Sequence, residues 1–416
     1  MSTELPASCD VAIVGGGPAG LAAATELRAR GVASVLVLER EGQAGGIPRH
    51  CGHYPFGMRE FHKVLRGPDY AARLVARARA AGVAVHTGVT VTHLLPSGTL
   101  EASTPGGLRR ITAQRVLLCT GVREKSRTAR LIGGTRPGGV LSTGALQGLV
   151  YLNGAAPFRK PVILGTELVS FSALLTCRHL AIRPVAMIEP NPRTTARWPA
   201  ALLPRIMNVP LLLNTELHSI HGDARVEEVV VREPDGRRRS IAADGVIVSG
   251  QFLPEASLLK ASHIEVDPHS GGPKVDQFGR CSDPAYFAAG NLLRAVETAG
   301  WSWSEGRRAG RALAASLAGS LPSPQDALTL RVEGDALKYV LPHRLAGGGR
   351  ETDAIIAIQM RVRRPARGRL RLRVDGGEVW SRALDALPER RISLPLSVLP
   401  PNARGDALFS LEEVET

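Results

Sequence analysis

Apolar residues near the start of the chain form two short runs on either side of a glycine-rich turn. Residues 11–14 and 35–38 are apolar and of strand length, and residues 18–30 between them have the composition of a helix. The turn, Gly15–Gly20, reads G-x-G-x-x-G, and an acid, Glu39, ends the second run. This pattern predicts a strand, a tight turn, a helix and a second strand.

Each part of this arrangement suits a bound dinucleotide. Gly15 allows the tight turn, Gly17 lets a pyrophosphate approach the backbone because it has no Cβ, and Gly20 lets the helix pack closely against the strand. The N–H groups and the positive dipole end of the helix then hold the phosphates. Glu39, nineteen residues after Gly20, can accept hydrogen bonds from ribose hydroxyls. A glycine pattern alone is weak, but with all these parts in order we expect a dinucleotide site.

Similar patterns recur further along the chain. Residues 115–121 and 244–250 are apolar strands that each end in a small residue and a glycine, and residues 162–170 repeat the strand and turn. We therefore expect two dinucleotide folds, one nested in the other. A third landmark, residues 286–291, precedes a helix expected at 299–318. Between these landmarks the periodicity predicts a helix over 69–81 and short strands within 83–93 and 99–112.

A Leu-Pro-Ser-Pro break at residues 321–324 marks a linker, after which alternating strands with Gly, Pro and Asp turns predict a small β-sandwich. The expected fold class is α/β, with two nested Rossmann-like dinucleotide-binding folds followed by a small C-terminal β-sandwich. The expected first dinucleotide-binding domain comprises residues 1–155 plus 284–320. The second, degenerate one comprises residues 156–283, and the sandwich comprises residues 327–416.

Composition narrows the class of protein. The chain has 416 residues, 44% of them hydrophobic, and no apolar run is long enough to span a membrane. The first strand begins by about residue 10, so we expect no signal peptide and a cytoplasmic location. The five cysteines are scattered without a C-x-x-C pair, which favours a reducing compartment and argues against a disulfide framework or a metal site.

The net charge of +14 raises the question of a nucleic-acid partner, but the arginines are widely dispersed. The dense run Arg361–Arg373 alternates with Leu370 and Leu372, as in a strand with one buried face and one solvated arginine face. An acidic partner protein, a nucleic acid or an anionic membrane are the alternatives. We favour the solvated face and expect no nucleic-acid partner.

The landmarks together resemble a known family. The N-terminal fingerprint, the Cys-Thr-Gly strand end at 119–121 and the Phe-Ala-Ala-Gly-Asn turn at 287–291 are similar to those of FAD-dependent oxidoreductases with two dinucleotide folds, in the pyridine nucleotide–disulfide oxidoreductase superfamily. The resemblance covers residues 8–318 and implies that the first fold binds FAD. The FAD-binding residues that it implies are Gly15, Gly17, Pro18, Ala19, Gly20, Glu39, Arg40, Gly46, Val91, Thr120, Gly121, Gly290, Asn291 and Thr298.

The chain departs from the family pattern at one position, and two of its segments resemble a narrower group within the family. The family usually has Asp where this chain has Asn291, which can still hydrogen-bond a ribityl hydroxyl but carries no charge. Residues 45–61 and 296–306 resemble a bacterial group of NAD(FAD)-dependent dehydrogenases associated with glycerol-3-phosphate catabolism. They are also similar to the electron-handling subunits of opine, hydroxyproline and glycine dehydrogenases.

The segment after Gly46 carries the candidate catalytic residues. Relatives that reduce disulfides have two cysteines there, but this chain has only Cys51, and a single thiol cannot form the redox disulfide. A dehydrogenase needs a proton acceptor within reach of its substrate, a task that histidine suits. We therefore take His50, Cys51 and His53 as the candidate catalytic residues. The alternatives are that these side chains pack against the flavin or lie at a subunit interface.

The second glycine turn departs from its pattern, because it reads Gly165-Thr-Glu167-Leu-Val-Ser170. A carboxylate stands where the backbone should approach a pyrophosphate, and its bulk and charge oppose that contact. Glu189, after the next strand, either holds a ribose or serves as a capping or solvent residue. We expect NAD(P) binding to be lost or weak, with electrons passing to or from a partner protein, a quinone or oxygen.

The late helix completes the expected cofactor site. Thr298 is its expected N-cap, and its N-terminus would face the flavin pyrimidine and stabilise negative charge there on reduction. Trp301 and Trp303 are expected in core packing, with flavin shielding or an interface as alternatives.

The chain is thus expected to be a FAD-dependent oxidoreductase. Its expected role is as a component of a hetero-oligomeric dehydrogenase that oxidises a small polar metabolite, and its expected partner is a companion subunit. The alternatives are an NAD(P)H-dependent flavin reductase and a non-catalytic FAD-bearing assembly subunit docked through the β-sandwich.

Overall fold

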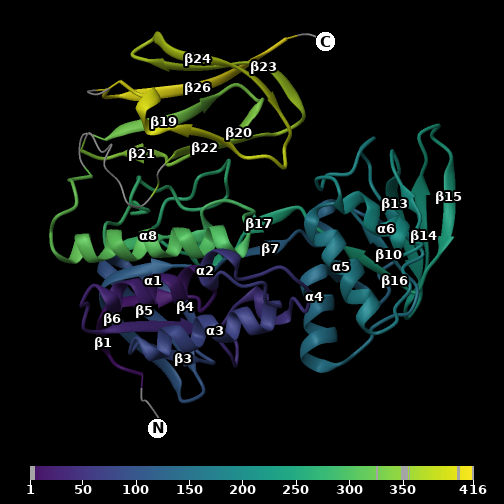
Figure 1. Ribbon diagram of the computed structural model, residues 1–416, viewed down its shortest axis with the longest axis horizontal. Coiled ribbons are helices and arrows are strands. Elements are labelled where there is room, and N and C mark those ends of the chain that lie inside the picture. Colours follow the sequence, from purple (N-terminus) through teal and green to yellow (C-terminus); the bar gives the residue numbers. More distant parts are fainter. Residues whose placement is uncertain (1–4, 325–326, 348–354, 356, 401–402, 415–416) are drawn as a thin grey trace. The chain divides into compact units, whose positions relative to one another are not determined.

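The computed structural model describes most of the chain (Figure 1), namely residues 5–324, 327–347, 355, 357–400 and 403–414. The chain divides into two compact units. The first unit comprises Met1–Gly46, Ala71–Val122 and Pro254–Thr416, and the second comprises Ile47–Tyr70 and Arg123–Leu253. The domain bounds expected from the sequence divide the chain differently and stay a prediction.

A mostly parallel sheet lies at the centre of the first unit. Its parallel part has the order β3-β2-β1-β6, and the long strand β6 pairs along its other edge with β18 and, antiparallel, with β5. Apolar strands such as β2, buried along its whole length, are typical of a parallel sheet whose two faces are covered. The bounds are β1 (Ser8–Val14), β2 (Val35–Glu39), β3 (Ala84–Thr87), β4 (Thr90–Leu95), β5 (Thr99–Thr104), β6 (Gly107–Leu118) and β18 (Tyr286–Ala288).

Three helices agree with the sequence pattern. They are α1 (Pro18–Ala29), α3 (Gly67–Ala80) and α8 (Ala299–Leu317). α1 and α8 run side by side (Figure 1), and Gly306 makes the close approach possible, because a Cβ there would lie 2.0 Å from the carbonyl oxygen of Ala19. A short helix, α7 (Ser257–Lys260), follows the return of the chain to this unit.

The second unit repeats the Rossmann-like plan. Its parallel sheet has the order β12-β11-β10-β16-β9, and a smaller sheet has the order β15-β14-β13-β8. The strand bounds are β8 (Gly133–Gly134), β9 (Val140–Ser142), β10 (Pro161–Leu164), β11 (Ala186–Ile188), β12 (Leu211–Leu212), β13 (Glu216–Gly222), β14 (Val226–Arg232), β15 (Arg238–Ala242) and β16 (Gly245–Val248). Its helices are α2 (Met58–Phe61), α4 (Thr143–Gln147), α5 (Leu168–His179) and α6 (Leu203–Ile206). The paired strands β7 (Val122–Glu124) and β17 (Phe252–Pro254) lie where the chain enters and leaves this unit.

The C-terminal part of the first unit is a β-sandwich. One sheet has the order β21-β19-β26-β23-β24, the other has the order β20-β22-β25, and side chains from both form one buried core. In β23 the leucines are buried while Arg367 and Arg369 are exposed, as the alternation predicts. The strand bounds are β19 (Leu328–Glu333), β20 (Leu337–Leu341), β21 (Arg344–Leu345), β22 (Ala357–Val362), β23 (Ala366–Val374), β24 (Gly377–Ala386), β25 (Ile392–Pro395) and β26 (Asp406–Glu413).

The sandwich packs on the first dinucleotide fold. Tyr339 and Leu341 from β20 share a buried core with Val275 and Leu292. The expected α/β class, with two Rossmann-like folds and a C-terminal sandwich, is therefore confirmed.

Candidate functional site: two dinucleotide turns and a histidine segment

The first glycine turn has the geometry that a dinucleotide needs. Gly15 has φ +111°, and a Cβ there would lie 2.4 Å from the carbonyl oxygen of Cys119. A Cβ on Gly20 would lie 2.0 Å from the carbonyl oxygen of Gly15, which explains the close packing of helix on strand. At Gly17 the nearest atom to such a Cβ is 3.9 Å away, in Gly46. The backbone of Gly17 is therefore open to a ligand, whereas its two companions serve the fold.

Glu39, at the end of β2, is buried beside this turn. Its Oε2 accepts the Gly16 N–H at 2.9 Å and its Oε1 accepts the Glu41 N–H at 2.9 Å. A carboxylate has about four acceptor positions, so each oxygen keeps one for a ribose hydroxyl. The backbone that lies beside Glu39 is that of Val89, whose N–H donates to the Glu39 carbonyl at 3.0 Å. Val91 is buried in the core of the sheet.

The loop after β2 folds over the turn. Gly45 donates its N–H to the Gly16 carbonyl at 2.7 Å, and Gly46, at φ +63°, lies so close to Gly17 that a Cβ on Gly46 would be 2.9 Å from the Gly17 Cα. Pro18 occupies the first turn of α1, where its missing N–H costs nothing. Arg40 is exposed and lies 3.8 Å from the Glu41 carboxylate.

The late turn closes on the same place. Gly290 has φ +74°, and a Cβ there would lie 2.9 Å from the Ala19 Cβ and 3.9 Å from the Ser302 Oγ. Ser302 is buried, and its hydroxyl has no hydrogen-bond partner within the described part of the chain. A buried hydroxyl without a partner is costly, so its position beside the turn fits a polar ligand group.

Two predicted contacts have partners inside the protein. The Asn291 amide donates to the Glu297 carbonyl at 3.0 Å and accepts the Glu297 N–H at 2.7 Å. Thr120 donates its hydroxyl to the Glu255 carbonyl at 2.8 Å, and the Gly121 carbonyl accepts the Glu255 N–H at 2.9 Å. These residues therefore shape the site, whatever further contacts they make.

Thr298 occupies the expected N-cap position. It is the N-cap residue of α8, but its side chain makes no capping hydrogen bond. Its carbonyl instead accepts the N–H groups of Trp301 and Ser302, each at 3.0 Å. Trp301 is half-buried, with the guanidinium of Arg391 4.2 Å from its ring centre, so it packs against the sandwich.

The second glycine turn is filled by its own side chains. The Thr166 hydroxyl donates to the Glu189 carboxylate, which also accepts the Asn191 N–H at 3.0 Å. The Glu167 carboxylate accepts the Gln251 N–H at 2.7 Å. Burial raises the pKa of Glu167, and the Gln251 N–H and the Arg130 charge oppose that rise. The acids on this turn and strand are therefore engaged within the protein.

The histidine segment belongs to the second unit and makes its contacts there. Cys51 is buried, and burial, with the nearby Glu124 charge, raises the pKa of its thiol to about 12. The thiol contacts the Gln147 Oε1 at 3.5 Å, and His53 Nε2 lies 2.6 Å from the Ser172 Oγ. His50 ends a short 3₁₀ turn (Ile47–His50) and is half-buried.

The structure thus gathers the predicted residues in two groups. Gly15–Gly20, Glu39, Gly46 and Gly290 come together in the first unit, and His50, Cys51 and His53 lie in the second. The sequence did not single out Gly45, Ser302, Gln147 or Ser172. The Gly-Gly pair that follows Glu39 could have pointed to Gly45. No local sequence signal points to Ser302, Gln147 or Ser172.

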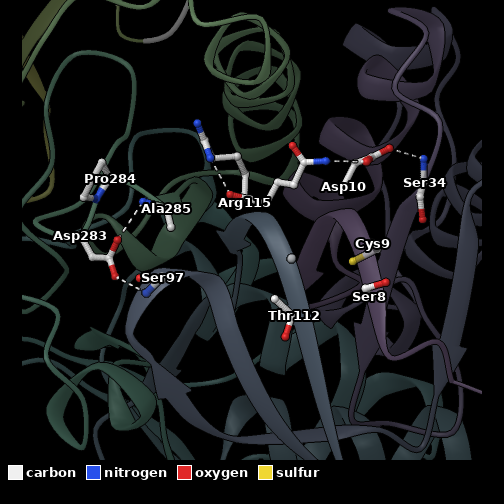
Figure 2. A pocket seen from close by; sticks show the side chains of 12 residues that line it. Ser8, Cys9, Asp10, Ser34, Ser97, Thr112, Arg115, Asp283, Pro284 and Ala285 are labelled. Atoms are coloured by element: carbon white, nitrogen blue, oxygen red, sulfur yellow. Dashed lines mark hydrogen bonds between the residues drawn. The ribbon is translucent and has the colours of Figure 1, made fainter.

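A separate hollow lies at the other end of β1. The hollow has a volume of about 690 Å³. Figure 2 shows side chains that line it, among them Asp10, Arg115 and Asp283. Asp10 accepts the Ser34 N–H at 2.8 Å, and Arg115 donates to the Ser316 Oγ at 2.7 Å. Because these charged side chains already bond within the protein, we assign the hollow no function.

The described residues contain neither a metal cluster nor a membrane-spanning helix. No group of three or more His, Cys, Asp or Glu side chains among them is arranged to hold a metal ion. No helix in this part of the chain has the length and apolar character needed to cross a membrane.

Known proteins resemble the chain in sequence and in fold. Residues 13–74 match a family described as an NAD(P)-binding Rossmann-like domain. An opine oxidase subunit of Rhizobium meliloti (strain 1021) is 26% identical over 272 residues, which are 61% of this chain and 55% of that protein. The corresponding opine oxidase subunit of Agrobacterium tumefaciens (strain Ach5) is 28% identical over 332 residues, 70% of this chain and 62% of that protein.

Solved structures agree on the fold. Thioredoxin reductase of T. acidophilum has a TM-score of 0.62 and 23% identity, over 75% of this chain and 99% of that one.

The chain spans less than two thirds of either opine oxidase subunit. These relatives are oxidoreductases by name, in agreement with the predicted enzyme class.

Proposed function

Because this chain belongs to the pyridine nucleotide–disulfide oxidoreductase superfamily, we propose that it is an FAD-dependent oxidoreductase that works without NAD(P)H. It would oxidise a small polar metabolite as one component of a heteromeric dehydrogenase. Electrons would leave through a companion subunit or another acceptor.

The first unit is the proposed FAD site. The open backbone at Gly17 and the N-terminus of α1 would hold the pyrophosphate, and Glu39 would accept hydrogen bonds from the ribose. The Ser302 hydroxyl beside Gly290 would bond a polar group of the cofactor. When bound, FAD supplies a two-electron acceptor, and the protein supplies binding and orientation.

The observation that carries the proposal is the contrast between the two glycine turns. The first leaves Gly17 open, while the second places the Glu167 carboxylate at the start of α5, bonded to the Gln251 N–H. A phosphate pair at that helix end would meet a negative charge where it needs open backbone. Glu189 is likewise bonded to Thr166 and Asn191. This supports loss of the nicotinamide site and disfavours the NAD(P)H-dependent flavin reductase.

The histidine segment supplies the proposed proton acceptor. A thiol with a pKa near 12 stays protonated at neutral pH, so Cys51 is a poor nucleophile there. His53 is half-buried and keeps an imidazole nitrogen near a hydroxyl that can give or accept a proton. We assign His53 the acceptor role, with His50 as the neighbouring candidate.

The substrate class comes from the relatives. The two matching opine oxidase chains are each named as one subunit of that enzyme. We therefore propose an opine-like metabolite as substrate and a companion chain as partner.

The test is an anaerobic spectroscopic experiment on the chain co-expressed with its genomic neighbours. The purified protein should be yellow, with one FAD per chain. An opine should bleach the flavin band, and glycerol-3-phosphate is the alternative substrate to include. NADH and NADPH should not bleach it. A colourless protein, or full bleaching by NADH, would overturn the proposal.

A further inference from the structure

Four side chains around the histidine segment form one hydrogen-bonded row. Cys51 Sγ lies 3.5 Å from Gln147 Oε1, and Gln147 Nε2 lies 2.7 Å from Ser172 Oγ. Ser172 Oγ lies 2.6 Å from His53 Nε2, and His53 Nδ1 lies 3.0 Å from the Tyr54 carbonyl oxygen. Gln147 and Ser172 are 2% and 9% exposed, so water competes little for these bonds.

The donors and acceptors in this row select one tautomer of the neutral imidazole. The Tyr54 carbonyl only accepts, so Nδ1 of His53 must carry a proton. In the neutral ring Nε2 is then an acceptor, and the Ser172 hydroxyl donates to it. Gln147 donates its amide N–H to the Ser172 oxygen and accepts the Cys51 thiol. In the neutral ring this arrangement uses the Nδ1–H tautomer of His53. The Cys51 thiol, at the far end of the row, has a second acceptor in the Ile47 carbonyl, 3.4 Å away.

The same row tolerates the protonated ring. When Nε2 of His53 gains a proton, it becomes a donor, and the Ser172 oxygen becomes its acceptor. The Ser172 proton can then turn to the Gln147 oxygen if the amide of Gln147 reverses, and the Cys51 thiol then donates to the Ile47 carbonyl, 3.4 Å away. A hydroxyl is suited to this exchange because it is both donor and acceptor.

The residues that hold the segment come from the second dinucleotide fold. Gln147 ends α4, and Ser172 lies in the first half of α5, the helix that follows the filled glycine turn. Tyr151 packs on the segment as well, because a Cβ on Gly52 would lie 2.1 Å from its ring. In a functional nucleotide site, the N-terminus of this helix would bind the phosphates. In this chain the helix contacts the histidine segment through Ser172.

We infer that the second fold serves as a positioning scaffold for the segment around His53. Ser172 and Gln147 are positioning residues that hold His53 as the Nδ1–H tautomer with Nε2 ready to take up a proton. The inference rests on the proposed role of His53 as proton acceptor, but the state of the ring can be measured without any substrate.

The test is ¹⁵N NMR of the resting, FAD-loaded protein with labelled histidine, at a pH where the ring is neutral. His53→Gln identifies the signals. The wild type should show a protonated Nδ1 and a bare Nε2 for His53. Ser172→Ala should lose that single state, and Ser172→Thr, which keeps the hydroxyl, should retain it. Ser170→Ala is the matched control, because Ser170 is a buried serine of the same helix bonded to Ser249.

Chemical modification gives a second readout. Diethyl pyrocarbonate should modify His53 about tenfold faster in Ser172→Ala than in the wild type, because the variant frees Nε2 from a hydrogen bond. A protonated Nε2 in the neutral wild type, or an unchanged tautomer and rate in Ser172→Ala, would overturn the inference. If the tautomer is as expected while no metabolite reduces the flavin, the proposed function fails and the positioning role stands.

Discussion

At the scale of single residues, the two glycine turns differ by a few side chains with large chemical consequences. Gly16 donates its backbone N–H to Glu39, and the corresponding Thr166 donates its hydroxyl to Glu189. Gly17 leaves open backbone, while Glu167 at the corresponding position adds a partly buried carboxylate. The two folds thus keep the same plan but offer opposite surfaces to a phosphate.

This contrast predicts that the second site can be reopened in part. Thr166→Gly combined with Glu167→Gly should strengthen NADH binding at least tenfold, because it removes the like charge and the bulk at the helix start. Isothermal titration calorimetry measures the change. Glu227→Gly, an exposed acid of the same unit, removes the same charge elsewhere and should have no effect. Equal weak binding in both variants would show that the turn is not what excludes the nucleotide.

The thiols give a second prediction at this scale. Burial raises the pKa of Cys51 to about 12, so at pH 8 only about one thiol in 10⁴ is ionised. Iodoacetamide should therefore leave Cys51 unlabelled in the folded protein for hours and label it within minutes in guanidinium, as followed by mass spectrometry. Rapid labelling of Cys51 in the folded state would restore a thiol mechanism.

At the scale of elements, close contacts between backbones decide where helices lie. α8 rests on α1 through Gly306, and the turn at Gly290 rests on Ala19. The strands, the helices α1 and α8 and the buried leucines of β23 follow from periodicity and glycine spacing, which are local signals. The partners of the histidine segment do not, since Gln147 and Ser172 lie about a hundred residues away and only the fold brings them to Cys51 and His53.

Thr298 and Asn291, which precede α8, show a second limit of prediction from sequence. Thr298 occupies the predicted N-cap position, but its hydroxyl makes no capping hydrogen bond, and only its carbonyl accepts N–H groups of the first turn. The Asn291 amide bonds the Glu297 backbone six residues ahead. The residue type indicates that a side chain can form a hydrogen bond. Its partner depends on the conformation of the turn, which the sequence pattern does not predict.

Gly306→Ala tests the helix contact. The added methyl would lie 2.0 Å from a backbone oxygen that cannot move aside as a side chain would, so we expect a loss of about 1–3 kcal/mol in the free energy of unfolding and less bound FAD. Gly148→Ala is the control, because Gly148 is also helical and has open space around it. Urea unfolding and the flavin-to-protein absorbance ratio provide the readouts. Equal stability of the two variants would contradict the packing described.

At the scale of the whole chain, the sandwich is tied to the first dinucleotide fold by charge as well as by apolar packing. Arg361 lies 3.3 Å and Arg391 3.4 Å from the Glu297 carboxylate, just before α8. His343, between β20 and β21, lies 3.5 Å from Asp267. The sandwich therefore holds the segment that leads into the N-terminus of α8, which gives it a structural role within this chain.

The Asp267 contact predicts a pH dependence of stability. Burial alone would raise the pKa of Asp267. The His343 imidazole, 3.5 Å away, and the Ser270 N–H, which donates to the carboxylate at 2.6 Å, outweigh burial and hold the pKa well below its usual range. A carboxylate with a lowered folded pKa stabilises the fold above its unfolded pKa, and this is lost as the pH falls through the folded value. Asp267→Asn should therefore cost about 1–3 kcal/mol at pH 7 and progressively less below about pH 4. Denaturant unfolding at several pH values measures the difference, and a cost that does not shrink in acid would contradict the assignment.

The central claim is that the chain carries a reducible FAD and takes no electrons from nicotinamide. The most direct measurement is an anaerobic titration of the purified, FAD-loaded protein, followed by the loss of flavin absorbance. Dithionite should bleach the flavin fully, while NADH and NADPH at millimolar concentration should leave the spectrum unchanged for minutes. Stoichiometric bleaching by either nucleotide would contradict the account, because it would require a working site at the turn that Thr166 and Glu167 fill.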